Sequence, residues 1–379
     1  MVILKILKII PIIIFVLTIF SGAHYFVHFS ATRFFGIASG KIRIILFLAI
    51  TIFSVSFFIS AFLVRLKENF LTSAIYFLSG FWLGLLLNLF MAAAASWLIF
   101  GLFKLTGYRP NTIILASIFF GLALAFSIYG VFNAFNPRVK NIEITIKNLP
   151  PAWQGKTVVQ LSDIHLGVVH KKAFLQKIID RTNTLNPDII FITGDLFDGT
   201  DGDLNSAIEP LNNLKAKNGI YFITGNHEIY LGLQKTFNFL KQTPVKILND
   251  EIVNINGLQI IGLSYSEKIS GFNMGNRDIK NIVLSKNNFI KGAPTILLNH
   301  APFGVKEAQE LGVNLELSGH THDGQLFPLN IINNLIWRGN SYGLHQSGDF
   351  SIYTTSGLGT WGPPMRTTSS PEIVAIKLK

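Results

Sequence analysis

The sequence predicts an α/β domain that follows a multi-span helical membrane region. The chain has 379 residues, is 49% hydrophobic and contains 33 Phe, which is more apolar than one ordinary soluble domain. The apolar excess lies in residues 1–134, whereas residues 139–379 alternate short β-rich runs with polar stretches of helical length. We therefore assign 1–134 to a transmembrane helical region and 139–379 to a soluble domain.

Four uncharged stretches in the first region are long enough to cross a bilayer. They are Ile9–Phe29, Ile44–Val64, a long one within Phe70–Phe103, and Thr112–Phe132. The third stretch has room for one tilted helix or for two short segments around Gly80. We expect a multi-pass protein of the cell membrane with about four spans. A cleaved secretory signal peptide is the alternative interpretation of the first stretch.

The charges of the two regions differ. Residues 1–132 hold nine Lys or Arg against one acid, and residues 133–379 hold 23 against 20. A basic excess between apolar spans suits anionic headgroups, so we expect membrane lipids rather than nucleic acid as partners. With four spans, the side that bears the soluble domain has six basic residues against five on the other, which favours a cytoplasmic location. Cysteine is absent, which excludes disulfides and thiolate ligands.

His24 and His28 stand four residues apart near the end of the first stretch, the spacing of a haem or metal pair on one helix face. The neighbouring sequence offers no further ligand. We interpret them as two interfacial histidines at a helix end.

The soluble region contains six short β-rich runs: TVVQL, DIIFIT, GIYFIT, QIIGL, TILLN and NLELS. Between them, KKAFLQKIIDRTN and NSAIEPLNNLKAK have the spacing of amphipathic helices. Strands that are apolar almost throughout indicate a sheet covered on both faces, and ligands of such sheets gather at the carboxyl ends of the strands.

Five of these runs end in polar side chains that can carry chemistry. These are Asp163 and His165, then Asp195 and Asp198, then Asn226, His227 and Glu228, then His300, and finally His320 and His322. Each motif alone is common in loops, but the joint order D-x-H, G-D-x-x-D, G-N-H-E, H and G-H-x-H at strand ends is specific. Carboxylate, imidazole and amide groups together bind hard or borderline divalent metals, and this pattern suggests two ions.

On these motifs the chain resembles the calcineurin-like metallophosphoesterases over about residues 139–379. The tail YTTSGLGTWGPPMRTTSSPEIVAI resembles their membrane-associated bacterial branch, which includes hydrolases of UDP-diacylglucosamine-type lipid precursors and four-span transmembrane phosphoesterases. One departure is that Asp323 and Gly324 follow the histidine pair where that branch continues with two glycines. The resemblance implies a two-sheet α/β sandwich.

The resemblance also implies a set of ligands for two divalent cations, which could be Mn, Fe, Zn or Mg. One ion would take Asp163, His165 and His322, the other would take Asn226, His300 and His320, and Asp195 would bridge both. Two such ions activate a water for attack on phosphorus and clamp the phosphoryl oxygens.

Four further residues receive roles. His227 resembles the family's catalytic histidine, which protonates the leaving group, and Asp198 resembles the acid that orients it. Glu228 is interpreted as a structural residue. Arg366 could meet a distal phosphate or carboxylate of the substrate, and its alternative role is structural.

The sequence therefore predicts a membrane-embedded, metal-dependent phosphoesterase that hydrolyses a phosphodiester or pyrophosphate bond of a lipid-linked substrate. The short connection NAFNPRVKNI would hold the site near the headgroups. The alternatives are a non-catalytic membrane sensor of a phosphorylated ligand and a phosphodiesterase for soluble nucleotides. A nuclease is disfavoured because the soluble region lacks a basic, aromatic groove.

Overall fold

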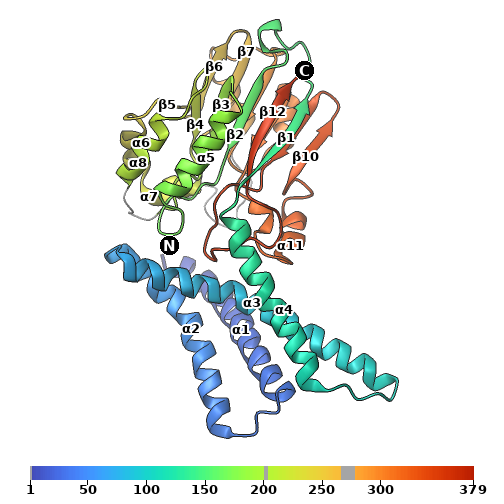
Figure 1. Ribbon diagram of the computed structural model, residues 1–379. Coiled ribbons are helices and arrows are strands. Elements are labelled where there is room, and N and C mark those ends of the chain that lie inside the picture. The colour runs from blue at the N-terminus through green and yellow to red at the C-terminus, as the bar shows by residue number, and fades with distance from the viewer. Residues whose placement is uncertain (1, 200–203, 266–277) are drawn as a thin grey trace. The chain divides into compact units, whose positions relative to one another are not determined.

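The computed structural model describes residues 2–199, 204–265 and 278–379 (Figure 1). Side chains of residues 2–10, 12, 13, 15 and 16 lie outside this description. The chain divides into two compact units, Met1–Val131 and Phe132–Lys379. The boundary falls three residues before the end of the predicted membrane region at residue 134.

The first unit is helical. Its helices are α1 (Val2–Phe34), α2 (Gly40–Leu66), α3 (Phe70–Leu105) and α4 (Thr112–Ala134), the last of which continues into the second unit. Within the described residues, α2, α3 and α4 have the length and apolar composition to cross a membrane. The first predicted span lies in α1, where part of the side chains is outside the description. The third predicted stretch is one unbroken helix of 36 residues and not two segments.

Polar side chains connect these helices to one another. The hydrogen-bonded pairs are Trp97 Nε1 to Ser30 Oγ at 3.0 Å, Ser60 Oγ with Ser79 Oγ at 2.9 Å, and Asn88 Nδ2 to Ser127 Oγ at 2.7 Å. In apolar surroundings such contacts replace the hydrogen bonds that water would otherwise supply.

His24 and His28 have different partners. His24 is buried, and its ring nitrogens contact the main-chain oxygen of Phe20 at 2.6 Å and the hydroxyl of Ser54. His28 Nε2 lies 2.9 Å from the main-chain oxygen of Arg43. Within the described part of the chain, the two imidazoles share no cluster of metal-ligating groups. His24 is thus a packed polar residue of the helical unit.

The second unit consists of two six-stranded sheets stacked face to face (Figure 1), which confirms the predicted two-sheet α/β sandwich. The first sheet has the order β1 (Arg138–Ile144), β12 (Glu372–Leu378), β2 (Thr157–Leu161), β3 (Ile189–Thr193), β4 (Ile220–Ile223) and β5 (Val245–Ile247). The second has the order β10 (Gly343–Ser347), β11 (Phe350–Thr354), β9 (Leu315–Ser318), β8 (Thr295–Leu298), β7 (Leu258–Gly262) and β6 (Glu251–Ile255).

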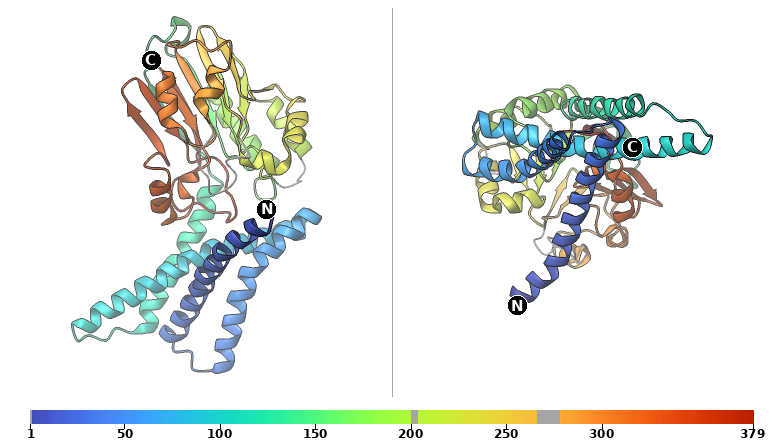
Figure 2. Two further views of the ribbon diagram at one scale, coloured as in Figure 1. Left: turned by 180° about the vertical axis from the view of Figure 1, so that it is seen from behind. Right: turned by 90° about the horizontal axis from the view of Figure 1, so that it is seen from below.

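Three apolar layers hold the second unit together. Between the sheets, Phe191 and Tyr221 of the first sheet share a core with Leu317 of the second. The described helices are α5 (Lys172–Thr184), α6 (Ile208–Asn212), α7 (Asn226–Leu231), α8 (Leu233–Leu240), α9 (Ile279–Leu284), α10 (Val305–Leu311) and α11 (Leu329–Ile336). Helices α5 and α8 pack on the outer face of the first sheet, and α9 and α10 on that of the second, which Figure 2 shows from behind.

The strand pairing places the predicted motifs together. Strands β2, β3 and β4 run parallel in the first sheet, and β7, β8 and β9 run parallel in the second. The carboxyl ends of parallel neighbours lie at one edge of a sheet, where ligand sites usually form. The side chains that follow these strands therefore meet at one end of the sandwich.

Glu372, the first residue of β12, is a buried carboxylate that joins the two sheets. It accepts hydrogen bonds from the hydroxyls of Tyr342 at 3.1 Å, Tyr353 at 2.9 Å and Thr355 at 2.9 Å, and from the main-chain N–H of Ser356 at 3.2 Å. A buried carboxylate is tolerated only when its oxygens have such partners.

We expect Glu372→Ala to lower the free energy of unfolding by about 3 kcal/mol, because each buried donor that loses its acceptor costs about 1–3 kcal/mol. The control Tyr342→Phe removes a single donor and should cost about 1 kcal/mol. Urea unfolding of the purified full chain in detergent would measure both. A loss for Glu372→Ala no larger than that of the control would contradict the role of Glu372.

Candidate metal centre

The polar motifs leave the ends of five strands from both sheets. In the first sheet, Asp163 and His165 follow β2, Asp195 follows β3, and Asn226 begins α7 after β4; in the second, His300 follows β8, and His320 and His322 follow β9. All of these side chains are buried except that of His320, which is partly exposed. The site therefore draws on both halves of the sandwich.

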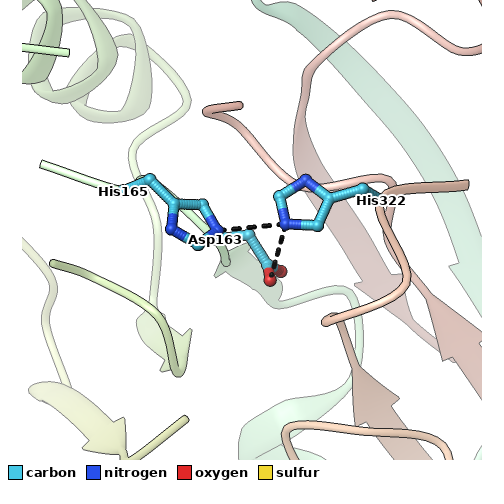
Figure 3. Close-up of side chains that lie close together, drawn as sticks. All are labelled: Asp163, His165 and His322. Carbon is cyan, nitrogen blue, oxygen red and sulfur yellow. Dashed lines mark hydrogen bonds and ion pairs between the residues drawn. The ribbon is translucent and has the colours of Figure 1, made fainter. Parts of the chain in front are cut away.

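Asp163, His165 and His322 form a first cluster that could hold a metal ion (Figure 3). The Nε2 atoms of His165 and His322 lie 3.0 Å apart, and His322 Nε2 is 3.5 Å from Asp163 Oδ1. Two facing imidazole nitrogens cannot both carry a proton at this distance, so at least one offers a lone pair. A buried lone pair beside a carboxylate suits a cation.

Asp195, His300 and His320 form a second cluster. His300 Nε2 lies 3.3 Å from Asp195 Oδ2 and 3.2 Å from Asn226 Oδ1. His300 Nδ1 lies 2.8 Å from the main-chain oxygen of Thr193, which can only accept, so Nδ1 donates. In the neutral ring Nε2 therefore carries the free lone pair, as a metal ligand requires.

Asp195 connects the two clusters. Its Oδ1 accepts a hydrogen bond from the main-chain N–H of His227 at 2.9 Å. Its Oδ2 lies 3.3 Å from His300 Nε2 and 3.8 Å from His165 Nε2. One carboxylate oxygen thus faces a ligand group of each cluster. The structure brings together all seven residues to which the sequence assigns metal binding.

The backbone is strained at five of these residues. The φ angles are 51° at Asp163, 51° at His165, 50° at Asp195, 68° at His320 and 51° at His322. Positive φ is uncommon outside glycine and costs about 1–3 kcal/mol per residue. Such strain concentrates at functional sites, where it turns a side chain sharply away from its strand.

The charges of the site favour a cation. Burial would raise the pKa of Asp195, but the imidazoles of His300 and His227 hold it well below its ordinary value. Burial would lower the pKa of His300, but the carboxylate of Asp195 raises it to about 10, whereas burial lowers that of His320 to about 3. The carboxylates thus draw a proton to His300 while His320 stays neutral. A divalent cation can take over the role of that proton, so the donor set fits a divalent metal site.

His227 forms a further group of potential metal ligands with His165 and Asp195, and Asp198 lies next to it. His227 Nδ1 is 2.8 Å from the main-chain oxygen of Asp198 and therefore donates to it. The carboxylate of Asp198 is farther away, 3.8 Å from that nitrogen and 3.5 Å from His165 Nδ1. His227 is thus hydrogen-bonded to the main chain of Asp198, and the acid group of Asp198 lies within ion-pair distance of the same nitrogen. This contact leaves Nε2 of His227 available.

Glu228 is a buried support, as interpreted from the sequence. Its carboxylate accepts hydrogen bonds from the main-chain N–H groups of Asp195, Phe197 and Gly225. Burial, with the nearby charge of Asp195, raises its pKa to about 7. Glu228 therefore joins the loop after β3 to the start of α7.

Arg366 is buried beside the candidate ligand His322. Its side chain is fully buried, donates to the main-chain oxygen of Gly359, and has Nη2 3.0 Å from His322 Nδ1. The burial of Arg366 and its contact with His322 favour the structural alternative named for it, in which Arg366 positions the His322 ring.

Asp323 lines a different cavity from the metal ligands. That cavity, of about 610 Å³, also contains Arg138, Lys140 and Glu372. Burial raises the pKa of Asp323 to about 6. The departure from the family pattern at this position therefore adds no carboxylate to the metal cavity.

Two glycines that received no role from the sequence leave the space that the carboxylates of Asp195 and Asp163 occupy. A Cβ on Gly225 would lie 2.1 Å from Asp195 Oδ1, and a Cβ on Gly319 would lie 2.2 Å from Asp163 Oδ2. The signal is present in the sequence, because Gly225 and Gly319 directly precede Asn226 and His320. Close approach of another group is a common reason for a glycine at such a place.

Comparison with known proteins agrees with this geometry. The profile of the calcineurin-like phosphoesterase family matches residues 156–324. The chain is 36% identical to a transmembrane protein with metallophosphoesterase domain from Danio rerio over 271 residues, 67% of this chain and 60% of that protein. It is 33% identical to a metallophosphoesterase of Campylobacter jejuni (73% of this chain, 74% of that one) and 31% identical to one of Aquifex aeolicus (68% and 98%).

We expect Gly225→Ala to weaken metal binding at both clusters, because the added methyl displaces the shared carboxylate of Asp195. Gly319→Ala displaces Asp163 and should weaken mainly the first cluster. Groups that support metal ligands usually change affinity by about 10- to 100-fold. Manganese retained after dialysis would be measured by mass spectrometry, with thermal unfolding as the control for folding. Equal metal loss in both variants would contradict the shared role of Asp195.

Proposed function

Because the chain belongs to the calcineurin-like metallophosphoesterase family, as its motifs indicate, we propose that it hydrolyses a phosphodiester or pyrophosphate bond with two divalent ions. The observation that carries this proposal is the position of Asp195. A single oxygen of this carboxylate faces His300 in one cluster and His165 in the other. A carboxylate shared in this way is suited to hold two cations at the short separation that phosphoryl transfer uses.

The proposed ligand sets follow the two clusters. Asp163, His165 and His322 would hold one ion, and Asn226, His300 and His320 the other. The chemistry that these ions supply when bound is the activation of a water molecule and the neutralisation of charge on the phosphoryl oxygens. Arg366 would hold the His322 ring in place behind this site.

His227 would protonate the leaving oxygen. Its Nδ1 is fixed by the main chain of Asp198, and its side chain lines the cavity next to the ligands. Burial lowers the pKa of His227. The negative charge of a bound phosphoryl group acts in the opposite direction and favours the protonated ring. A sensor that only binds a phosphorylated ligand would have no use for this acid, so we favour catalysis.

We further propose a lipid-linked substrate, with membrane lipids as the surroundings of the enzyme and no nucleic acid partner. Among the residues that the structure describes, three helices are apolar and long enough to span a membrane. Only residues 135–137 separate the end of α4 from the start of β1, a connection that limits how far the domain can move from the end of that helix. An acyl-anchored substrate is concentrated at the bilayer, whereas a soluble one gains nothing from this arrangement. With four spans, the side of the membrane that bears the soluble domain has six basic residues and the opposite side has five, which favours a cytoplasmic location of the domain.

We expect His227→Ala to retain bound manganese but to slow the hydrolysis of an alkyl phosphodiester by about 10²- to 10⁴-fold. Hydrolysis of bis-p-nitrophenyl phosphate should slow much less, because nitrophenolate leaves without protonation. Asp195→Asn is the comparison that should lose metal and both activities. An equal loss of kcat on the two substrates, at unchanged metal content, would rule out the role of His227 as the acid.

The lipid assignment is tested with matched acylated and deacylated pyrophosphate substrates of the same headgroup. The purified full chain should show a kcat/KM about tenfold or more higher on the acylated substrate, because its methylenes add apolar contact area. Chelation of the metal should abolish both reactions. Equal efficiency on the two would exclude the lipid assignment and leave the phosphoesterase proposal in place.

A further inference from the structure

Helix α11 is apolar and exposed, although it belongs to the sandwich unit. It buries none of its side chains, and Ile332 is 55% exposed, Leu335 74% and Ile336 51%. A surface helix of a globular domain normally turns its apolar stripe into the core. An exposed cluster of large aliphatic side chains marks a surface that contacts something else.

One face of α11 lines a cavity that reaches the metal centre. The cavity has a volume of about 610 Å³, within the range of ligand pockets. Leu329, Ile332 and Ile336 lie on one face of the helix and form part of the lining together with Trp361. The same cavity is lined by Asp195, Asn226, His227, His320 and His322. A molecule with its phosphoryl group on these ligands can therefore place the adjoining substituent against α11.

The polar side chains beside these apolar residues already have hydrogen-bond partners. Asn333 donates from Nδ2 to the main-chain oxygen of Thr321 at 3.1 Å and accepts from Trp337 Nε1 at 3.1 Å. Gln325 both donates to and accepts from the main chain of Trp361, at 3.0 and 2.9 Å. These amides hold the wall in shape and offer little to a sugar or a base. The apolar surface beside them suits an aliphatic chain.

We propose that the wall formed by Leu329, Ile332, Ile336 and Trp361 binds an acyl chain attached next to the scissile phosphoryl group. This inference rests on the proposed phosphoesterase function, because the metal centre fixes the phosphoryl end of the substrate. The occupant is an acyl chain because the cavity joins an anion-binding end to an aliphatic wall, as a lipid phosphate joins its headgroup to its chain. Three helices in the described part of the chain are long and apolar enough to span a membrane, which would place the protein among such lipids.

The other apolar face of α11 supplies a matched control. Ile331 is 55% exposed and Leu335 74% exposed, and neither lines the cavity. The double variant Ile332→Asn/Ile336→Asn alters the wall, and Ile331→Asn/Leu335→Asn makes the same kind of change on the same helix outside it. Each alters two exposed residues, so both should fold alike in thermal unfolding. Partition of a probe into detergent is also the same for all variants.

The test compares butyl phosphate with octyl phosphate as ligands of the manganese-loaded full chain in detergent, by isothermal titration calorimetry. Octyl phosphate should bind about tenfold or more tightly than butyl phosphate, since a fully buried methylene contributes about fourfold and these would be partly buried. The variant Ile332→Asn/Ile336→Asn should bring this ratio of Kd values close to one. The variant Ile331→Asn/Leu335→Asn should leave the ratio unchanged.

Two results would overturn the acyl site. One is a wild-type chain that binds the two phosphates equally, and the other is an equal loss of the ratio in both double variants, which would indicate contact of the whole helix with detergent or bilayer. Hydrolysis of bis-p-nitrophenyl phosphate is measured separately. A chain that prefers octyl phosphate but hydrolyses nothing would retain the acyl site and refute the proposed function.

Discussion

The carboxylate of Asp195 is the constraint on which the rest of the site depends. Its Oδ1 is held by the N–H of His227, and its own main-chain N–H is held by Glu228. Gly225 leaves the space that the carboxylate occupies, since a Cβ there would overlap it. These contacts fix Oδ2 between His300 and His165. A carboxylate that faces two clusters must keep one orientation, and each of these neighbours restricts its rotation.

The two-sheet architecture is what makes such a site possible. The loops after β2 and β3 supply carboxylates from one sheet, and the loops after β8 and β9 supply imidazoles from the other. Five of the seven candidate ligands turn sharply out of their strands, with positive φ angles. The apolar core between the sheets, which includes Phe191, Tyr221 and Leu317, stabilises the fold and so offsets the cost of the strained backbone and of the buried charge. A divalent cation would offset much of that charge by binding.

Sequence patterns predicted which polar residues meet at the site because parallel strands end at the same edge, so motifs far apart in the chain converge. Patterns could not predict what depends on three-dimensional contact. Arg366 does not directly follow a strand, and its partner His322 lies 44 residues earlier. The hydrogen bond from His227 to Asp198 uses a main-chain oxygen, which any residue type possesses. The edge strands β1, β5, β6 and β10 were not predicted, since their exposed residues break up the apolar runs. The inner strands β11 and β12, although buried, were also not among the predicted runs.

Helix α11 is a second feature whose surroundings could not be predicted from the sequence. Its sequence LNIINNLI is that of a helix with a buried stripe, and only the tertiary structure shows that Ile332 and Ile336 are exposed. In the proposed enzyme, the metal end of the cavity would bind any phosphoryl group strongly and without selectivity, because the cations attract its negative charge whatever the substituent. The apolar wall would select by the area it covers, a contribution that is non-directional and grows with each methylene. Reaction and substrate choice would then reside in different residues of one cavity, and changes in α11 could alter the preferred ester without disturbing the metal ligands.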